Sequence, residues 1–164
     1  MATTPQTSLH RVEAYERAFL MVSAVMLIVF LGALTYAGTM HDVHLPGAGQ
    51  RIDPRAIYKT PPFDHPAVHE TPSGDVEAVI TAQAWIYLPT EIHVPVNRQV
   101  RFILSSADVI HGFEIIGTNV NAMIIPGQVT QLTHTFRTPG EYRIVCHEYC
   151  GLGHHTMTAK VIVQ

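Results

Sequence analysis

Both cysteines of the chain lie in one short stretch near its C-terminus, CHEYCGLGHHTM, residues 146–157. Cys146, Cys150, His154 and Met157 follow the pattern C-x3-C-x3-H-x2-M, and the glycines within it indicate a tight loop. An upstream stretch, SSADVIHGF, offers one more imidazole from His111 on a second loop. Because soft copper ions favour thiolate, imidazole and thioether ligands, these residues predict a copper site built from two loops.

The number of cysteines indicates which kind of copper site this is. A mononuclear electron-transfer site takes two His, one Cys and a weak axial Met, which leaves one cysteine over. Two thiolates can instead bridge a pair of copper ions, each capped by one His, with Met157 and a backbone carbonyl as weak axial contacts. The loop therefore favours a dinuclear copper centre.

Other readings of the same residues remain open. A disulfide between Cys146 and Cys150 is the default outside the cytoplasm, but it leaves His154 and Met157 unexplained. A zinc site with two Cys and two His has little use for the methionine. A membrane-tethered mononuclear cupredoxin leaves one cysteine idle, and a copper-delivery thiol protein requires a thioredoxin-like βαβ pattern. We expect that His134, His147 and His155 are not ligands.

The elements that must position these loops are short strands. From Val76 onward, β-rich runs alternate with turn signals such as Pro126-Gly127 and Pro139-Gly140. The runs cover residues 76–87, 91–95, 99–104, 113–117, 120–125, 129–136, 140–146 and 158–163. This pattern predicts an all-β sandwich or barrel, and roughly 90 residues suit one small sandwich.

The N-terminal part of the chain predicts a membrane anchor. Residues 18–40 carry no charge and are long enough for one helical crossing, which favours an uncleaved helix over a signal peptide. Residues 1–17, with Arg11 and Arg17, are then expected on the cytoplasmic side. Residues 41–75 hold six of the eleven prolines and are expected to form an extended linker.

The charge of the chain argues against one class of partner and indicates how another would dock. The net charge of −3 argues against nucleic acid, which requires clustered Lys and Arg. From Val76 onward, the chain has six acidic and five basic residues, so the domain is nearly neutral. We therefore expect an electron donor to dock mainly through apolar contact, with weak dependence on salt.

The stretch CHEYCGLGHHTM, with DVIHGF and PGEYRIVC upstream, resembles subunit II of haem-copper cytochrome c oxidases and the loop of their dinuclear copper A centre. The resemblance implies a cupredoxin-like β-sandwich (Greek key) over residues 76–164, with one N-terminal transmembrane helix. It implies two bridging thiolates, two terminal imidazoles, one weak axial thioether and one carbonyl ligand, supplied in that order by Cys146 and Cys150, His111 and His154, Met157, and Glu148.

The resemblance also implies a function. Such a subunit sits in the plasma membrane of a prokaryote, with its copper domain on the periplasmic side. It accepts electrons from cytochrome c and passes them to haem in subunit I, where oxygen is reduced to water. An aromatic stretch near the copper marks where electrons enter, which points to Trp85 and Tyr87. Related quinol oxidases have lost the copper ligands, which this chain keeps. Some nitric oxide reductases use the same copper centre, so a nitric oxide reductase subunit remains an alternative function.

Two features bear on the branch of the family. The single membrane helix resembles B-type oxidases, whose subunit II is short and single-spanning. Glu148 resembles a glutamate that, in many A-type enzymes, also reaches a magnesium ion at the contact with subunit I. A magnesium ion bound through Glu148 is therefore an additional expectation.

Overall fold

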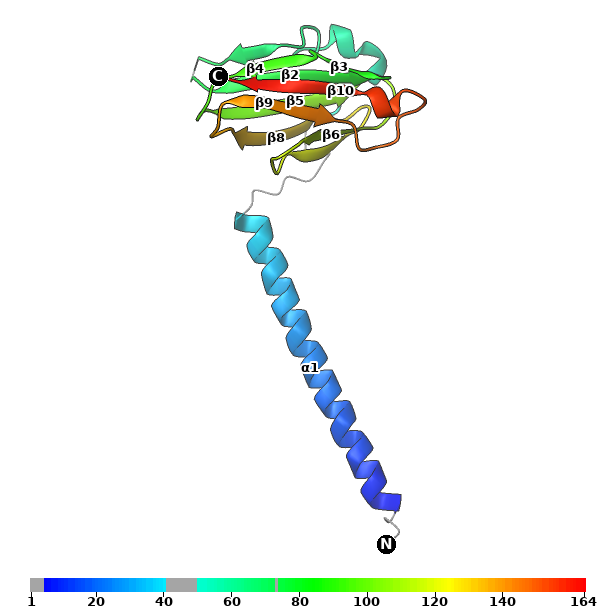
Figure 1. Ribbon diagram of the computed structural model, residues 1–164. Helices are drawn as coiled ribbons and strands as arrows, with labels where there is room; N and C mark the ends of the chain where they lie inside the picture. The colour runs from blue at the N-terminus through cyan, green and yellow to red at the C-terminus, as the bar shows by residue number, and fades with distance from the viewer. Residues whose placement is uncertain (1–4, 41–49, 73) are drawn as a thin grey trace. The chain divides into compact units, whose positions relative to one another are not determined.

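The N-terminal unit is one long helix. The structure, a computed structural model, describes residues 5–40, 50–72 and 74–164. Helix α1 spans Pro5–Met40 (Figure 1), and its stretch Arg11–Met40 is long and apolar enough to cross a membrane. Its 36 residues exceed the roughly 20 that a bilayer core requires. The helix therefore contains the predicted crossing at 18–40 and continues toward the N-terminus beyond it.

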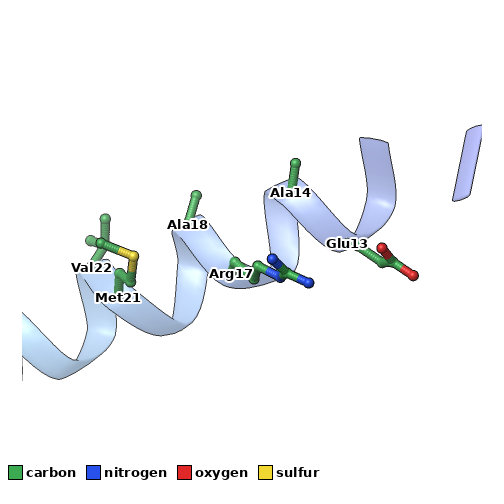
Figure 2. Close-up of a pocket in the computed structure, with 6 residues that line it drawn as sticks. All are labelled: Glu13, Ala14, Arg17, Ala18, Met21 and Val22. Atoms are coloured by element: carbon green, nitrogen blue, oxygen red, sulfur yellow. The ribbon is translucent and has the colours of Figure 1, made fainter. Parts of the chain in front are cut away.

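A shallow hollow lies along the N-terminal half of α1 (Figure 2). It is lined by Glu13, Ala14, Arg17, Ala18, Met21 and Val22, all of them side chains of this one helix. The apolar side chains of Met21 and Val22 line one end of the hollow. The charged side chains of Glu13 and Arg17, one helical turn apart, line the other end. This is the composition of a helix that leaves the apolar core of a membrane, and it offers no set of metal ligands.

The C-terminal unit is a sandwich of two five-stranded sheets, as the strand pattern predicts. The first sheet has the order β1-β2-β5-β8, with β3 paired to β2, and the second has the order β4-β10-β9-β6-β7. Their strands are β1 (Val68–Glu70), β2 (Val76–Gln83), β3 (Ile86–Leu88), β4 (Glu91–Val94), β5 (Gln99–Ser106), β6 (His111–Ile115), β7 (Asn121–Ile124), β8 (Thr130–Thr135), β9 (Gly140–Val145) and β10 (Thr158–Val163).

The main core lies between the two sheets. Alternating positions along β10 point inward and are buried, as period-2 geometry requires. Four aromatic rings fill the centre and meet in edge or tilted contacts, namely those of Tyr87, Phe102, Phe113 and Phe136. This packed interior fixes the ends of the strands from which the ligand loops leave.

Two parts of the chain differ from their sequence-based description. The run 76–87 is a hairpin, in which β2 and β3 pair antiparallel with Gln83 opposite Ile86. The turn was not predicted because its residues include no Gly or Pro. The described part of the proline-rich stretch is not merely an extended connector, since it forms the 3-10 helix η1 (Pro54–Lys59) and strand β1.

The same stretch adds a second, smaller core to the sandwich. Ile57 and Phe63 are fully buried against Val79 and Ile103, which lie on the outer face of the first sheet, and against Val129, which directly precedes β8. The proline-rich stretch therefore covers a sheet face that residues 76–164 alone would expose to water.

We expect Phe63→Ala to destabilise the sandwich by about 3–5 kcal/mol, because it removes a buried ring and leaves a cavity. Chemical unfolding of the full-length chain, followed by fluorescence of its one tryptophan, measures this loss. The exposed Lys59→Ala change on η1 is the control and should shift stability by less than about 0.5 kcal/mol. Equal stability of the two variants would mean that the covering stretch contributes little to folding.

Candidate metal centre

The predicted ligands gather at one end of the sandwich. His111 is the first residue of β6, and Cys146 directly follows β9. Cys150, His154 and Met157 lie between β9 and β10, where the short helix η2 (His154–Thr156) closes the loop. Figure 1 shows this loop, orange to red, at the end of β10 opposite the C-terminus.

The two thiols form the middle of the cluster. Both cysteines are free and buried, and their Sγ atoms lie 3.8 Å apart. A disulfide requires about 2.05 Å between sulfurs, so the structure has no disulfide here. The ligand atoms of His111, Cys146 and Cys150 all lie within 4.8 Å of one another, a spacing that one or two metal ions can bridge.

Three further donor groups surround the thiols. His154 places its Nδ1 at 3.6 Å from the Cys150 Sγ, and the Met157 Sδ lies 3.8 Å from the same sulfur. The backbone oxygen of Glu148 lies 3.2 Å from the Cys146 Sγ. The structure therefore brings together every residue that the sequence assigns to the centre.

The imidazole of His111 is fixed in one orientation. Its ring is fully buried, and its Nε2 lies 2.9 Å from Oδ1 of Asp108. Burial acts to raise the pKa of Asp108, but hydrogen bonds from His111 and from the amides of Ala84 and Val109 outweigh it and lower that pKa. An ionised Asp108 therefore holds the proton on Nε2, an arrangement common around metal-binding histidines.

The other nitrogen of His111 is ready to bind. Its Nδ1 is a buried polar atom without a hydrogen-bond partner in the part of the chain that the structure describes. A buried nitrogen lone pair without a partner is costly, and a metal ion next to the thiols would satisfy it. This orphaned atom is direct support for a metal at this end of the sandwich.

The thiols themselves also favour a cation. Burial is the main cause, and the neighbouring Cys146 the second, that raises the pKa of the Cys150 thiol to about 11. The metal-free centre therefore holds the Cys150 thiol protonated at neutral pH, because burial makes its thiolate costly. A soft metal ion removes that penalty and binds as the protons leave, so the donor set fits copper.

The neighbouring histidines lie differently from the ligands. His155 is exposed, and the His147 Nδ1 faces Glu148, with 3.8 Å to its Oε1. His134 lies in β8, where its Nδ1 contacts Asn119 and its ring packs edge-on against Phe136. That none of the three binds the metal stays an expectation.

The two aromatic residues predicted for electron transfer have different surroundings. Trp85 is 41% exposed and lies directly on the ligand loop, where its Nε1 donates to the Cys150 carbonyl at 3.1 Å. Tyr87 is completely buried, and its hydroxyl donates to the Gly112 carbonyl at 2.5 Å. Tyr87 therefore presents no surface to a docking partner, contrary to our expectation.

Sequence reasoning missed two residues that support the ligands. Asp108 and Gly112 flank His111 within DVIHGF, but neither residue type signals a metal site by itself. Gly112 lies so close to the second loop that an added Cβ would fall 2.5 Å from the backbone nitrogen of His147. The backbone amide of Gly112 also donates to the Cys146 Sγ at 3.3 Å.

Comparison with known proteins agrees with this geometry. Residues 73–164 match the family described as cytochrome C oxidase subunit II, periplasmic domain. Cytochrome c oxidase subunit 2 of Thermus thermophilus is 39% identical over 155 residues, which are 92% of this chain and 92% of that protein. A second Thermus thermophilus sequence of the same name is 40% identical over 134 residues, covering 80% of this chain and 99% of its own.

Solved structures show the same fold. A chain of a haem-copper terminal oxidase dimer, determined by cryo-EM, superposes with a TM-score of 0.71 at 32% identity, covering 92% of this chain and 99% of its own. The periplasmic domain of cytochrome oxidase subunit II from Bradyrhizobium japonicum has a TM-score of 0.51 at 24% identity and supports the fold alone, covering 54% of this chain and 83% of its own. The predicted cupredoxin-like sandwich with one N-terminal apolar helix is thus confirmed.

Proposed function

The chain belongs to the cytochrome c oxidase subunit II family, and we propose that it is the subunit through which electrons enter a terminal respiratory oxidase. It accepts electrons from cytochrome c and passes them to haem in subunit I, which reduces oxygen to water. Membership of this family supports the coarser part of the proposal, that the chain is a copper-binding subunit of a membrane complex. The observation that carries the finer proposal is the convergence of two thiols, two imidazoles, a thioether and a carbonyl.

We assign the ligands of a dinuclear copper A centre from the donor set. Cys146 and Cys150 would bridge a pair of copper ions, His111 and His154 would each cap one, and Met157 would bind weakly. Glu148 would contribute its backbone oxygen. Copper in such a pair supplies the one-electron chemistry, accepting an electron and releasing it again.

The protein's own contribution is a rigid, dry cage. The thiols and Met157 are buried, and Asp108 and the Gly112 amide hold His111 and Cys146 in place. Ligands that are held before metal binding do not rearrange when the charge of the centre changes. A small rearrangement is what fast electron transfer requires of this domain.

The donor surface follows from exposed apolar side chains around the ligands. Five large ones flank or contact the ligand loops, with exposures from 41% to 85%, namely Trp85, Val109, Ile110, Tyr149 and Leu152. Tyr149 also lies edge-on to the ligand His154, with 5.8 Å between ring centroids. We therefore place the docking site for cytochrome c on this apolar end of the sandwich.

We expect Leu152→Ala to slow electron transfer from cytochrome c severalfold, because it removes the most exposed of these apolar contacts. Ile116→Ala is the matched control, since Ile116 is 47% exposed but follows the far end of β6. Stopped-flow rates at several salt concentrations measure both effects. A steep fall of the rate with salt would contradict apolar docking.

One helix in the described part of the chain is long and apolar enough to cross a membrane, which supports placing the chain in the B-type branch, as a single-pass protein of a prokaryotic plasma membrane with its copper domain on the periplasmic side. The Glu148 carboxylate is 42% exposed, which leaves it available to a magnesium ion at a contact with subunit I. Mn²⁺ can be used as a paramagnetic probe of a magnesium site. Loss of the paramagnetic resonance signal of bound Mn²⁺ in a Glu148→Gln oxidase would support such a site, and an unchanged signal would contradict it.

The proposal is tested by loading the full-length chain with copper and recording the metal content with the electron paramagnetic resonance spectrum. We expect a pair of coppers and a hyperfine pattern from one electron shared equally between two nuclei. One copper with a single-nucleus pattern would instead indicate a mononuclear carrier. No bound copper, with the two cysteines joined, would refute the oxidase function.

A further inference from the structure

A segment that supplies no metal ligand hydrogen-bonds to both ligand loops. Residues 84–87 comprise the turn Ala84-Trp85, which joins β2 to β3, and the first two residues of β3, and they lie against the ligand end of the sandwich. The first of these residues, Ala84, donates its backbone N–H to Oδ2 of Asp108 at 2.7 Å. The other oxygen of that carboxylate holds His111, so one side chain connects the turn to a terminal ligand.

Trp85 connects the turn to the second loop. Its Nε1 donates to the carbonyl of Cys150, and its ring lies on two glycines of the loop. A Cβ added at Gly153 would fall 2.5 Å from the indole, and one at Gly151 would fall 3.0 Å from Nε1. The loop therefore folds directly onto the indole, with no room for a side chain between them.

Tyr87 makes the third connection. Its buried hydroxyl donates to the Gly112 carbonyl at 2.5 Å. This hydrogen bond fixes the backbone of Gly112. The amide of that same glycine donates to the Cys146 Sγ.

From these contacts we propose that the segment 84–87 is a brace that positions the ligands of the metal centre. Trp85 and Tyr87 act from the brace on Cys150 and Cys146, and Asp108, to which the brace donates a hydrogen bond, acts on His111. The inference rests on the proposed function and extends it. An aromatic residue that only fills space would not require its polar atom, whereas a brace does.

The test removes one polar atom at a time from the full-length chain. Trp85→Phe and Tyr87→Phe keep an aromatic ring and lose the N–H or the hydroxyl. Tyr142→Phe is the matched control, because the Tyr142 hydroxyl also donates to a backbone carbonyl, that of Thr138, away from the ligands. Thermal unfolding is recorded alongside to show that each variant is folded.

Two measurements decide the inference. In the metal-free chain, we expect amide hydrogen exchange over residues 108–113 in Tyr87→Phe, and over residues 146–153 in Trp85→Phe, to be about tenfold faster than in wild type. In the copper-loaded chain, we expect transfer of copper to a chelator to be about tenfold faster in both variants, with altered hyperfine splitting. Tyr142→Phe should match wild type in both.

The outcomes that contradict the brace differ from the outcome that contradicts the proposed function. Rates within twofold of wild type in both variants would overturn the brace. Faster exchange with unchanged copper transfer and spectrum would also overturn it, because the segment would then stabilise the loops without positioning the ligands. A wild-type chain that binds no copper would refute the proposed function, and the exchange measurement on the metal-free chain would still decide whether the segment holds the loops.

Discussion

Replacing Cys150 with serine should abolish the dinuclear centre. The Sγ of this residue is the atom on which the cluster converges, at 3.8 Å from the Cys146 sulfur, 3.6 Å from His154 Nδ1 and 3.8 Å from Met157 Sδ. A serine hydroxyl is a hard, weakly acidic ligand that soft copper does not favour. We therefore expect Cys150→Ser to bind one copper or none.

The measurement is copper content together with the paramagnetic resonance spectrum of the full-length variant. His155→Ala is a suitable control, because His155 is exposed and adjacent to the ligand His154. It should leave the copper content and the spectrum unchanged. A Cys150→Ser protein that kept a pair of coppers and a shared-electron spectrum would contradict thiolate bridging.

The candidate ligands could be proposed from the sequence because they are concentrated in two short stretches. Cys146, Cys150, His154 and Met157 fall within twelve residues, so their convergence depends on one loop and little on the rest of the fold. His111 was harder to assign, and its role depended on the family resemblance. The structure places His111, whose buried Nδ1 has no hydrogen-bond partner among the residues it describes, in one cluster with both thiols.

The supporting contacts could not be predicted, because they depend on tertiary packing between distant parts of the chain. Trp85 and Cys150 are 65 positions apart, and Tyr87 and Gly112 are 25 apart. No periodicity in the sequence predicts such pairs. The hairpin turn Ala84-Trp85 was missed for the same reason, since the carboxylate of Asp108 holds it and it contains no Gly or Pro.

This packing changes how a mutation of Trp85 should be interpreted. A Trp85→Ala protein that transfers electrons slowly would lose both an exposed docking surface and the hydrogen bond to the Cys150 carbonyl. Trp85→Phe separates the two, because it keeps an aromatic ring for apolar contact and removes the N–H donor. Donor binding that is normal in Trp85→Phe, with an altered copper spectrum, would assign the residue to positioning.

Gly112→Ala should have the second large effect, on both stability and copper binding. An ideal Cβ on this residue would lie 2.5 Å from the His147 backbone nitrogen and 2.7 Å from its Cγ. Because part of that obstacle is backbone, the strand β6 and the ligand loop must separate. Separation breaks the Gly112 N–H bond to the Cys146 Sγ and displaces the adjacent ligand His111.

We expect Gly112→Ala to lower the free energy of unfolding by about 1–3 kcal/mol, as overpacking does, and to weaken copper binding at least tenfold. Chemical unfolding and copper competition with a chelator measure the two effects. Gly117→Ala is the control, because Gly117 has a φ of +84° with open space around it and lies in the turn after β6.

That control should lose stability through backbone strain alone and bind copper as wild type does. Equal loss of copper affinity in the two variants would show that the centre responds to general destabilisation of the sandwich. A loss confined to Gly112→Ala would show that the close approach of β6 to the ligand loop sets the geometry of the centre. In that case, the absence of a side chain at residue 112 is as much a requirement of the metal site as the thiols are.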